Sequence, residues 1–139
     1  MKLVNKEISF TIPGKTVSKS NQYRISAKGK FPFLYKTQQT KDYEALSIPI
    51  IEDEIKLQGW IRATGPVRVY IFVNYNDLRA RDLDNTFKII LDLMNERIYE
   101  DDNQVFEIIA KKTIDKTSDP FAKVTVVEIS DALNTKKIK

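Results

Sequence analysis

The sequence contains neither cysteine nor histidine, and these two absences exclude several kinds of site. Without cysteine the chain has no disulfides and no thiolate ligands, and without both residue types a zinc site of the usual kind cannot form. A histidine general base and a Ser-His-Asp triad are excluded as well. Any bound metal ion must therefore be held by carboxylates, amides or backbone oxygens.

Long apolar runs are also missing, and the first seven residues lack the apolar core of a signal peptide. We therefore expect a cytoplasmic protein with no membrane association. Hydrophobic residues make up 42% of the chain and charged residues 30%, which is the balance of an ordinary globular protein. The length of 139 residues suits one domain, so we expect a single domain over residues 1–139 with a flexible tail at 132–139.

Acidic residues are absent between Ile8 and Lys41, although the net charge of the whole chain is only +4. Basic and aromatic side chains alternate there instead. The basic residues are Lys15, Lys19, Arg24, Lys28, Lys30, Lys36 and Lys41, and the aromatic ones are Tyr23, Phe31, Phe33 and Tyr35. Such a stretch suits contact with a phosphate-rich polymer, and it equally suits a solvated loop with aromatic residues packed beneath it.

The first half of the chain alternates between short regular segments and turn residues. Alternating apolar residues predict a strand at 7–12 that ends at Pro13-Gly14. Residues 15–36 have no clean period and predict a long basic loop, of the length that is usually functional or disordered. Residues 37–57 are rich in helix formers, and Pro49 predicts that this helix is broken near Ser47-Ile48.

The second half contains the most regular patterns. Apolar residues at the odd positions of 67–75 predict a strand, and a helix is expected from the capping residues Asp84-Asn85 to about Asn95. Two final strands are expected at 104–112 and 121–129, as a hairpin or meander. This order of elements predicts an α+β fold, in which a mixed or antiparallel sheet of about four strands packs against two helices.

Two pairs of acids flank the second predicted helix. Asp82 and Asp84 are two residues apart, which on an extended segment places both carboxylates on one side, where they can share one ion. Asp101 and Asp102 follow about twenty residues later in a turn. If the strands on either side of the helix are neighbours, the turn could come toward the same edge of the sheet. Mg²⁺ is a natural ion for such oxygen ligands.

A simpler interpretation also accounts for each acid. Asp84 could cap a helix and Asp101-Asp102 could form an ordinary turn, because aspartate is common in both roles. Clustered like charges are unfavourable without a compensating cation, and Arg79 and Arg81 could compensate them as well as a metal ion could. Lys88 lies one turn after Asp84, where it could form an ordinary ion pair or hold a phosphate.

The stretch from Arg79 to Lys88 resembles a known family. It reads Arg79-Ala80-Arg81-Asp82-Leu83-Asp84-Asn85-Thr86-Phe87-Lys88 and is followed by Asp92 and then by Asp101-Asp102-Asn103-Gln104-Val105. This ordered pattern is similar to that of the RusA family of bacterial and phage Holliday junction resolvases. Ser20-Asn21-Gln22-Tyr23-Arg24 resembles an early segment of the same family, and the strongest similarity covers about residues 79–105.

The resemblance implies a set of site residues. The metal-binding aspartates of the family fall on Asp82, Asp84 and Asp102, and its essential lysine falls on Lys88; Asp101, Asp92 and Asn85 are secondary candidates. DNA contacts are expected from Lys15, Lys19, Arg24, Lys28, Lys30, Lys36, Arg79 and Arg81. The connector before Asp102 is about one residue shorter than the family pattern, which alters the loop and removes no ligand.

The resemblance also implies a function. We expect an endodeoxyribonuclease that depends on Mg²⁺, with Mn²⁺ as a substitute, and that resolves four-way junctions as a homodimer by paired cuts in DNA recombination and repair. Three alternatives remain open from the sequence. They are a nuclease for other branched DNA such as forks and flaps, a non-catalytic DNA-binding or regulatory phage protein, and a structural domain whose acids are only caps and turns.

Overall fold

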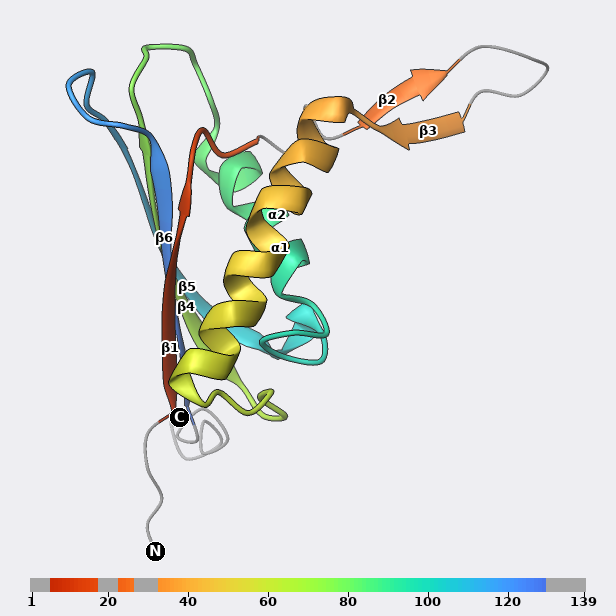
Figure 1. Ribbon diagram of the computed structural model, residues 1–139, viewed down its shortest axis with the longest axis vertical. Helices are drawn as coiled ribbons and strands as arrows, with labels where there is room; N and C mark the ends of the chain where they lie inside the picture. The colour runs from red at the N-terminus through yellow and green to blue at the C-terminus, as the bar shows by residue number, and fades with distance from the viewer. Residues whose placement is uncertain (1–5, 18–22, 27–32, 130–139) are drawn as a thin grey trace, which may run out of the picture.

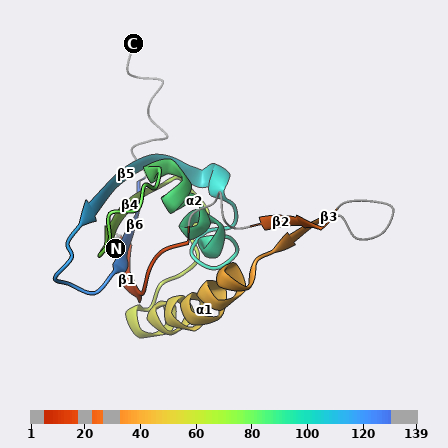
Figure 2. The same cartoon turned by 90° about the horizontal axis from the view of Figure 1, so that it is seen from above.

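A four-stranded mixed sheet forms the centre of the structure (Figure 1). The structure is a computed structural model, and it describes residues 6–17, 23–26 and 33–129. Its strands follow the order β1 (Glu7–Pro13), β6 (Phe121–Glu128), β4 (Val67–Tyr75) and β5 (Val105–Ile114). Among the neighbouring strands described in this sheet, only the pair β4 and β5 is parallel. Helices α1 (Gln38–Gln58) and α2 (Leu83–Met94) cover one face of this sheet (Figure 2). The predicted α+β class, with about four strands and two helices, is confirmed.

The core lies between this covered face and the two helices. Alternate residues of β1, β6 and β4 point into it and are buried: Ile8, Phe10 and Ile12 of β1, Ala122, Val124 and Val126 of β6, and Val67, Val69, Ile71, Val73 and Tyr75 of β4. Full burial of one such aliphatic side chain contributes about 1.5–3 kcal/mol. The apolar odd positions of β4 therefore determine which side of the strand the helices cover.

Helix α1 is continuous, and the predicted break at Pro49 is wrong. Proline removes one backbone hydrogen bond within the helix. The packing of the helix compensates for this loss, because Tyr43, Ser47 and Ile51 share a buried face. Gly59 ends the helix in a left-handed conformation at φ 66°. Burial of one face of the helix thus outweighs the tendency of Pro49 to break it.

The expected loop at 15–36 is partly regular. Strands β2 (Tyr23–Ser26) and β3 (Phe33–Lys36) pair in an antiparallel hairpin that stands away from the main sheet (Figures 1 and 2). The prediction of an irregular loop is therefore wrong for these eight residues. Lys19, Lys28, Lys30 and the predicted tail at 132–139 lie outside the described residues.

The last two strands are not neighbours, so the predicted hairpin or meander is wrong. β4 lies between β5 and β6, because β5 pairs in parallel with β4 after the crossover through α2. Asn74 of β4 holds the connection between them: its amide donates to Ser118 Oγ at 3.0 Å, and its Oδ1 accepts from Thr113 Oγ1 at 2.8 Å. No helix in the described part of the chain is long and apolar enough to span a membrane.

Candidate functional site

The first acid pair lies at the N-terminus of α2. Asp82, and not Asp84 or Asn85, is the N-cap residue, and its carbonyl accepts the Thr86 amide at 3.1 Å and Thr86 Oγ1 at 3.0 Å. The Asp82 carboxylate makes no capping hydrogen bond. Asp84 lies in the first turn, and both acids are exposed to solvent at least in part. Two carboxylates thus face solvent where the helix dipole and free N–H groups favour negative charge.

Lys88 lies beside this pair, one turn further along α2. Its Nζ is 3.8 Å from Asp84 Oδ2, and both side chains are about half-exposed. An exposed ion pair at this spacing on a helix contributes only about 0.3–0.5 kcal/mol. Lys88 therefore has little structural role in this pair, and its ammonium group can reach a ligand bound next to Asp84.

The segment before Asp82 is held by Tyr75 and Asp77. The Arg81 guanidinium lies over the Tyr75 ring, 3.9 Å from its centroid, and donates to both carboxylate oxygens of Asp77 at 2.7 and 3.3 Å. Tyr75 in turn donates its hydroxyl to the Thr16 carbonyl at 2.7 Å. Lys112 Nζ donates to the Arg81 carbonyl. The residue directly before Asp82 is thus fixed through both its side chain and its backbone.

Several residues expected to contact DNA are already paired within the chain. The Arg81 side chain is only 11% exposed, Lys15 bonds Asp77 at 2.8 Å, and Lys36 bonds Glu44 at 2.7 Å. Arg79 is exposed next to the acid pair. The side chain of Arg24 lies outside the described part. Among the predicted DNA contacts whose side chains are described, Arg79 and Lys15 are exposed, and Lys15 is engaged by Asp77.

The Asp77 cluster predicts a pH dependence of folding. The hydrogen bonds from Arg81 and Lys15 hold the pKa of Asp77 well below its ordinary value. Because the carboxyl group ionises more easily in the folded state, its stabilising effect is complete above the unfolded pKa of about 4 and decreases progressively as the pH falls from there toward the folded pKa. We expect Asp77→Asn to lower Tm at pH 7, and by a progressively smaller amount as the pH falls from about 4 to about 2. Thermal unfolding across this range measures this; a loss that stays constant with pH would contradict the assignment.

The second acid pair lies in a turn after α2. Asp101 caps the short 3-10 helix Asp102–Gln104, and its carboxylate accepts the Asn103 amide at 3.3 Å. Gln104 Oε1 accepts the amides of Glu100 and Asp101 at 2.8 and 3.0 Å, and its Nε2 donates to the carbonyls of Ala63 and Gly65. Since the capping role falls to Asp101, Asp102 is the acid of this pair that is available to a ligand.

Tyr99, which is buried, lies close to this turn. The Tyr99 hydroxyl donates to the Leu91 carbonyl at 2.8 Å, and burial raises the pKa of Tyr99 far above its ordinary value. The charges of Asp102, Asp92 and Asp101 raise it further, in that order. Asp92, Asp101 and Asp102 therefore lie around the C-terminal part of α2.

The structure does not bring Asp102 to Asp82 and Asp84 within one chain. The strands around α2 are neighbours, as the sequence argument required, but they are parallel, so the turn lies at the opposite end of the sheet. Asp102 precedes Val105 at the start of β5, whereas Lys112 near its end bonds the residue before Asp82. Seven residues of strand span about 23 Å. No group of three acids able to hold a metal ion occurs among the described residues.

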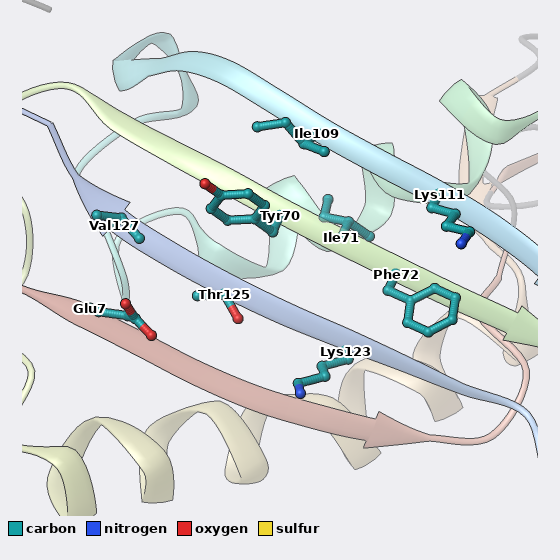
Figure 3. A pocket seen from close by; sticks show the side chains of 9 residues that line it. All are labelled: Glu7, Tyr70, Ile71, Phe72, Ile109, Lys111, Lys123, Thr125 and Val127. Atoms are coloured by element: carbon teal, nitrogen blue, oxygen red, sulfur yellow. The ribbon is translucent and has the colours of Figure 1, made fainter.

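The uncovered face of the sheet has a shallow depression of about 510 Å³ (Figure 3). Tyr70, Phe72, Lys111 and Lys123 line it from β4, β5 and β6, on the side away from the helices. The Lys111 ammonium lies 5.8 Å from the centre of the Phe72 ring. Aromatic rings beside lysines suit binding of nucleic acid more than catalysis. This group of aromatic and lysine side chains was not predicted from the sequence. Tyr70 and Phe72, at the even positions of β4, could have indicated it, because those positions face away from the buried side of the strand.

The start of α2 combines two exposed carboxylates with a lysine, on a small α+β fold. Such a site can bind a cation and a phosphate together, which is typical of proteins that act on phosphate-containing ligands. Comparison with known families makes this specific: the model of the endodeoxyribonuclease RusA family matches residues 13–127. The chain belongs to the RusA family. The family consists of endodeoxyribonucleases that act on branched DNA. No curated protein matches the chain.

Proposed function

We propose that this protein is a divalent-metal-dependent endonuclease that resolves four-way DNA junctions by paired cuts, with Mg²⁺ as its ion and Mn²⁺ as a substitute. One observation supports it most directly. Asp82 and Asp84 expose two carboxylates at a firmly held helix N-terminus, within the segment that resembles the family's site.

The donor set at α2 fits Mg²⁺. This ion is typically held by one or two carboxylates, and its other positions are occupied by water and by the phosphates of the substrate. Asp82 and Asp84 would hold it. Asp102 lies at the other end of the sheet within one chain, so as a third ligand it would have to come from a second copy in a homodimer. When bound, the ion lowers the pKa of a coordinated water and neutralises charge on the phosphodiester. Hydrolysis assisted by a metal ion in this way would need no histidine base, and the chain contains no histidine.

The neighbouring basic residues would position the DNA. The Lys88 ammonium would bind the phosphate next to Asp84 and stabilise the negative charge that develops on it in the transition state. Arg79 would contact the backbone beside the acid pair. The contribution of Arg81 would be to hold Asp82 in place, because its own guanidinium is occupied by Asp77 and Tyr75.

The experiment is a cleavage assay on labelled four-way, three-way, flap and linear duplex DNA, with Mg²⁺, Mn²⁺ or EDTA. We expect symmetric cuts in the four-way junction with either metal, and none with EDTA. Preferential cleavage of flaps or forks would favour the alternative substrate class. Binding of junctions without any cleavage would favour a regulatory protein on the same fold. A protein that neither binds nor cleaves any of these DNAs would contradict the proposal as a whole.

A further inference from the structure

The uncovered face of the sheet carries two aromatic side chains on an inner strand. Tyr70 is 39% exposed and Phe72 37%, at alternate positions of β4. Both helices lie on the other side of this strand, so neither ring is part of the core (Figure 2). A solvated sheet face usually carries polar residues, and apolar groups that stay in contact with solvent often mark a binding surface. The two rings are therefore available to a ligand.

Lysines flank Phe72 on both sides. In the register of the sheet, Phe72 pairs with Lys123 of β6 and with Lys111 of β5, so the two lysines lie on either side of the ring (Figure 3). Both lysines are exposed, and neither forms an ion pair with any residue that the structure describes. The acid that lines the depression, Glu7, pairs with Val127, which is about 13 Å along β6 from Lys123. Positive charge is thus concentrated around Phe72.

Phe121 and Lys111 hold the Phe72 ring in place. The rings of Phe72 and Phe121 are nearly perpendicular, at 87°, with their centroids 5.7 Å apart, which is a favoured geometry for an aromatic pair. The Lys111 ammonium lies 5.8 Å from the centre of the Phe72 ring, within the range of a cation–π contact. A ring that is already fixed loses little conformational freedom when a flat group stacks on it, and this favours binding.

The spacing of the two rings favours a single strand over a duplex. Tyr70 and Phe72 are two residues apart, which separates them by about 7 Å along β4. Bases within a duplex are stacked about 3.4 Å apart, and only their edges are accessible in the grooves. Rings at about twice that distance instead fit neighbouring bases of an unstacked strand, one base on each ring. Proteins bind single strands in this way, with aromatic rings for the bases and positive charge for the backbone.

We propose that the uncovered face of the sheet binds single-stranded DNA, with bases stacked on the two rings and phosphates held by Lys111 and Lys123. The nucleic acid is DNA because the RusA family acts on branched DNA, and branched DNAs such as forks and flaps contain single strands. The face also ends near the candidate site: Lys112, the neighbour of Lys111, bonds the carbonyl directly before Asp82. A single strand bound here lies at the same end of the sheet as the acid pair.

Binding of fluorescently labelled oligothymidylate in EDTA tests the proposal without any cleavage, so the result does not depend on the proposed function. We expect Phe72→Ala to weaken binding of the single strand about 10-fold or more, and to leave binding of a linear duplex of the same length unchanged. Phe72→Leu keeps an apolar side chain in the sheet and removes the aromatic face, so it should weaken binding comparably. Unchanged single-strand affinity in both variants, or equal losses for single strand and duplex, would overturn the proposal.

The lysines have a separate signature in the salt dependence of binding. Each phosphate contact contributes about 0.7 to the slope of log affinity against log salt for a single strand. We expect Lys111→Ala and Lys123→Ala each to reduce this slope by about that amount. The matched control is Lys56→Ala on α1, away from this face, which should leave the slope unchanged. A wild-type slope in both sheet variants would contradict the phosphate contacts.

A tryptophan at the stacking position reports the contact with bases directly. Phe72→Trp should retain the wild-type affinity for oligothymidylate, and the added indole fluorescence should be quenched when the oligonucleotide binds. Leu57→Trp, at an exposed position on α1, is the matched control and should not be quenched; the natural Trp60 is buried and contributes the same background to both. Equal fluorescence changes in the two variants would overturn the stacking. If Phe72→Ala alters sedimentation of the protein and not its affinity for DNA, the face binds a second copy and the proposal is wrong.

Discussion

Replacement of Asp82 by asparagine is expected to abolish Mg²⁺-dependent cleavage of a four-way junction while leaving binding of the junction largely intact. The asparagine side chain would keep the shape of the aspartate and the backbone role at the start of α2, where Asp82 caps through its carbonyl and not through its carboxylate. It would lose the negative charge that holds the ion. Loss of residues that merely support a metal ligand costs about 10–100-fold, so loss of a ligand should cost more than about 100-fold.

Two measurements separate this effect from a general loss of charge or fold. Single-turnover cleavage and junction binding are compared with those of Asp53→Asn, which removes an exposed acid from α1 far from the site in sequence. The control should cleave at the wild-type rate, and both variants should unfold at the wild-type temperature. Full cleavage by Asp82→Asn would refute the metal assignment.

Replacement of Lys88 by alanine is expected to reduce kcat by about 100-fold with little change in KM, because removal of one group that stabilises transition-state charge typically costs about 10²–10³-fold. Folding should be preserved, since the Lys88–Asp84 contact is long and exposed. Lys88→Arg retains the charge and should recover part of the rate. Steady-state cleavage of the junction measures all three proteins.

The matched control for Lys88 is Lys56→Ala, a lysine in the last turn of α1. It removes one positive charge from a helix without touching the candidate site, so its kcat should equal that of the wild type. A wild-type kcat for Lys88→Ala as well would reduce Lys88 to a surface ion pair. A rise in KM alone would assign Lys88 to binding of the DNA.

Predictions from local patterns succeeded where burial repeats regularly along the chain. The odd positions of 67–75 predicted β4, and the end of α2 near Asn95 is confirmed. Such predictions failed where contacts between residues far apart in the sequence decide the local structure. Pro49 lies inside a continuous helix because Tyr43, Ser47 and Ile51 are buried on one face. Residues 23–26 and 33–36 pair with each other although neither segment has a clean period.

The candidate site shows the same division. The expectation that Asp82 and Asp84 share one ion assumed an extended segment. Asp82 is instead the N-cap of α2 and Asp84 lies in its first turn, so the shared ion remains a proposal. The role of Arg81 could not be predicted, because its partners Tyr75 and Asp77 are identified only when the connector folds back on itself. Gln104 organises the second acid turn through carbonyls of residues 63 and 65, about forty positions earlier in the chain.

By itself the sequence determined which chemistry is open to this protein. The absence of cysteine and histidine limits a metal ion to oxygen ligands, and the order of residues from Arg79 to Val105 indicated the family that the comparison confirms. Only the tertiary structure decided where the acids lie. Because β4 and β5 are parallel, the connection through α2 must return along the full length of the sheet, so it separates Asp102 from Asp82 and Asp84. Strand direction depends on pairing between distant segments, and residue spacing does not record it.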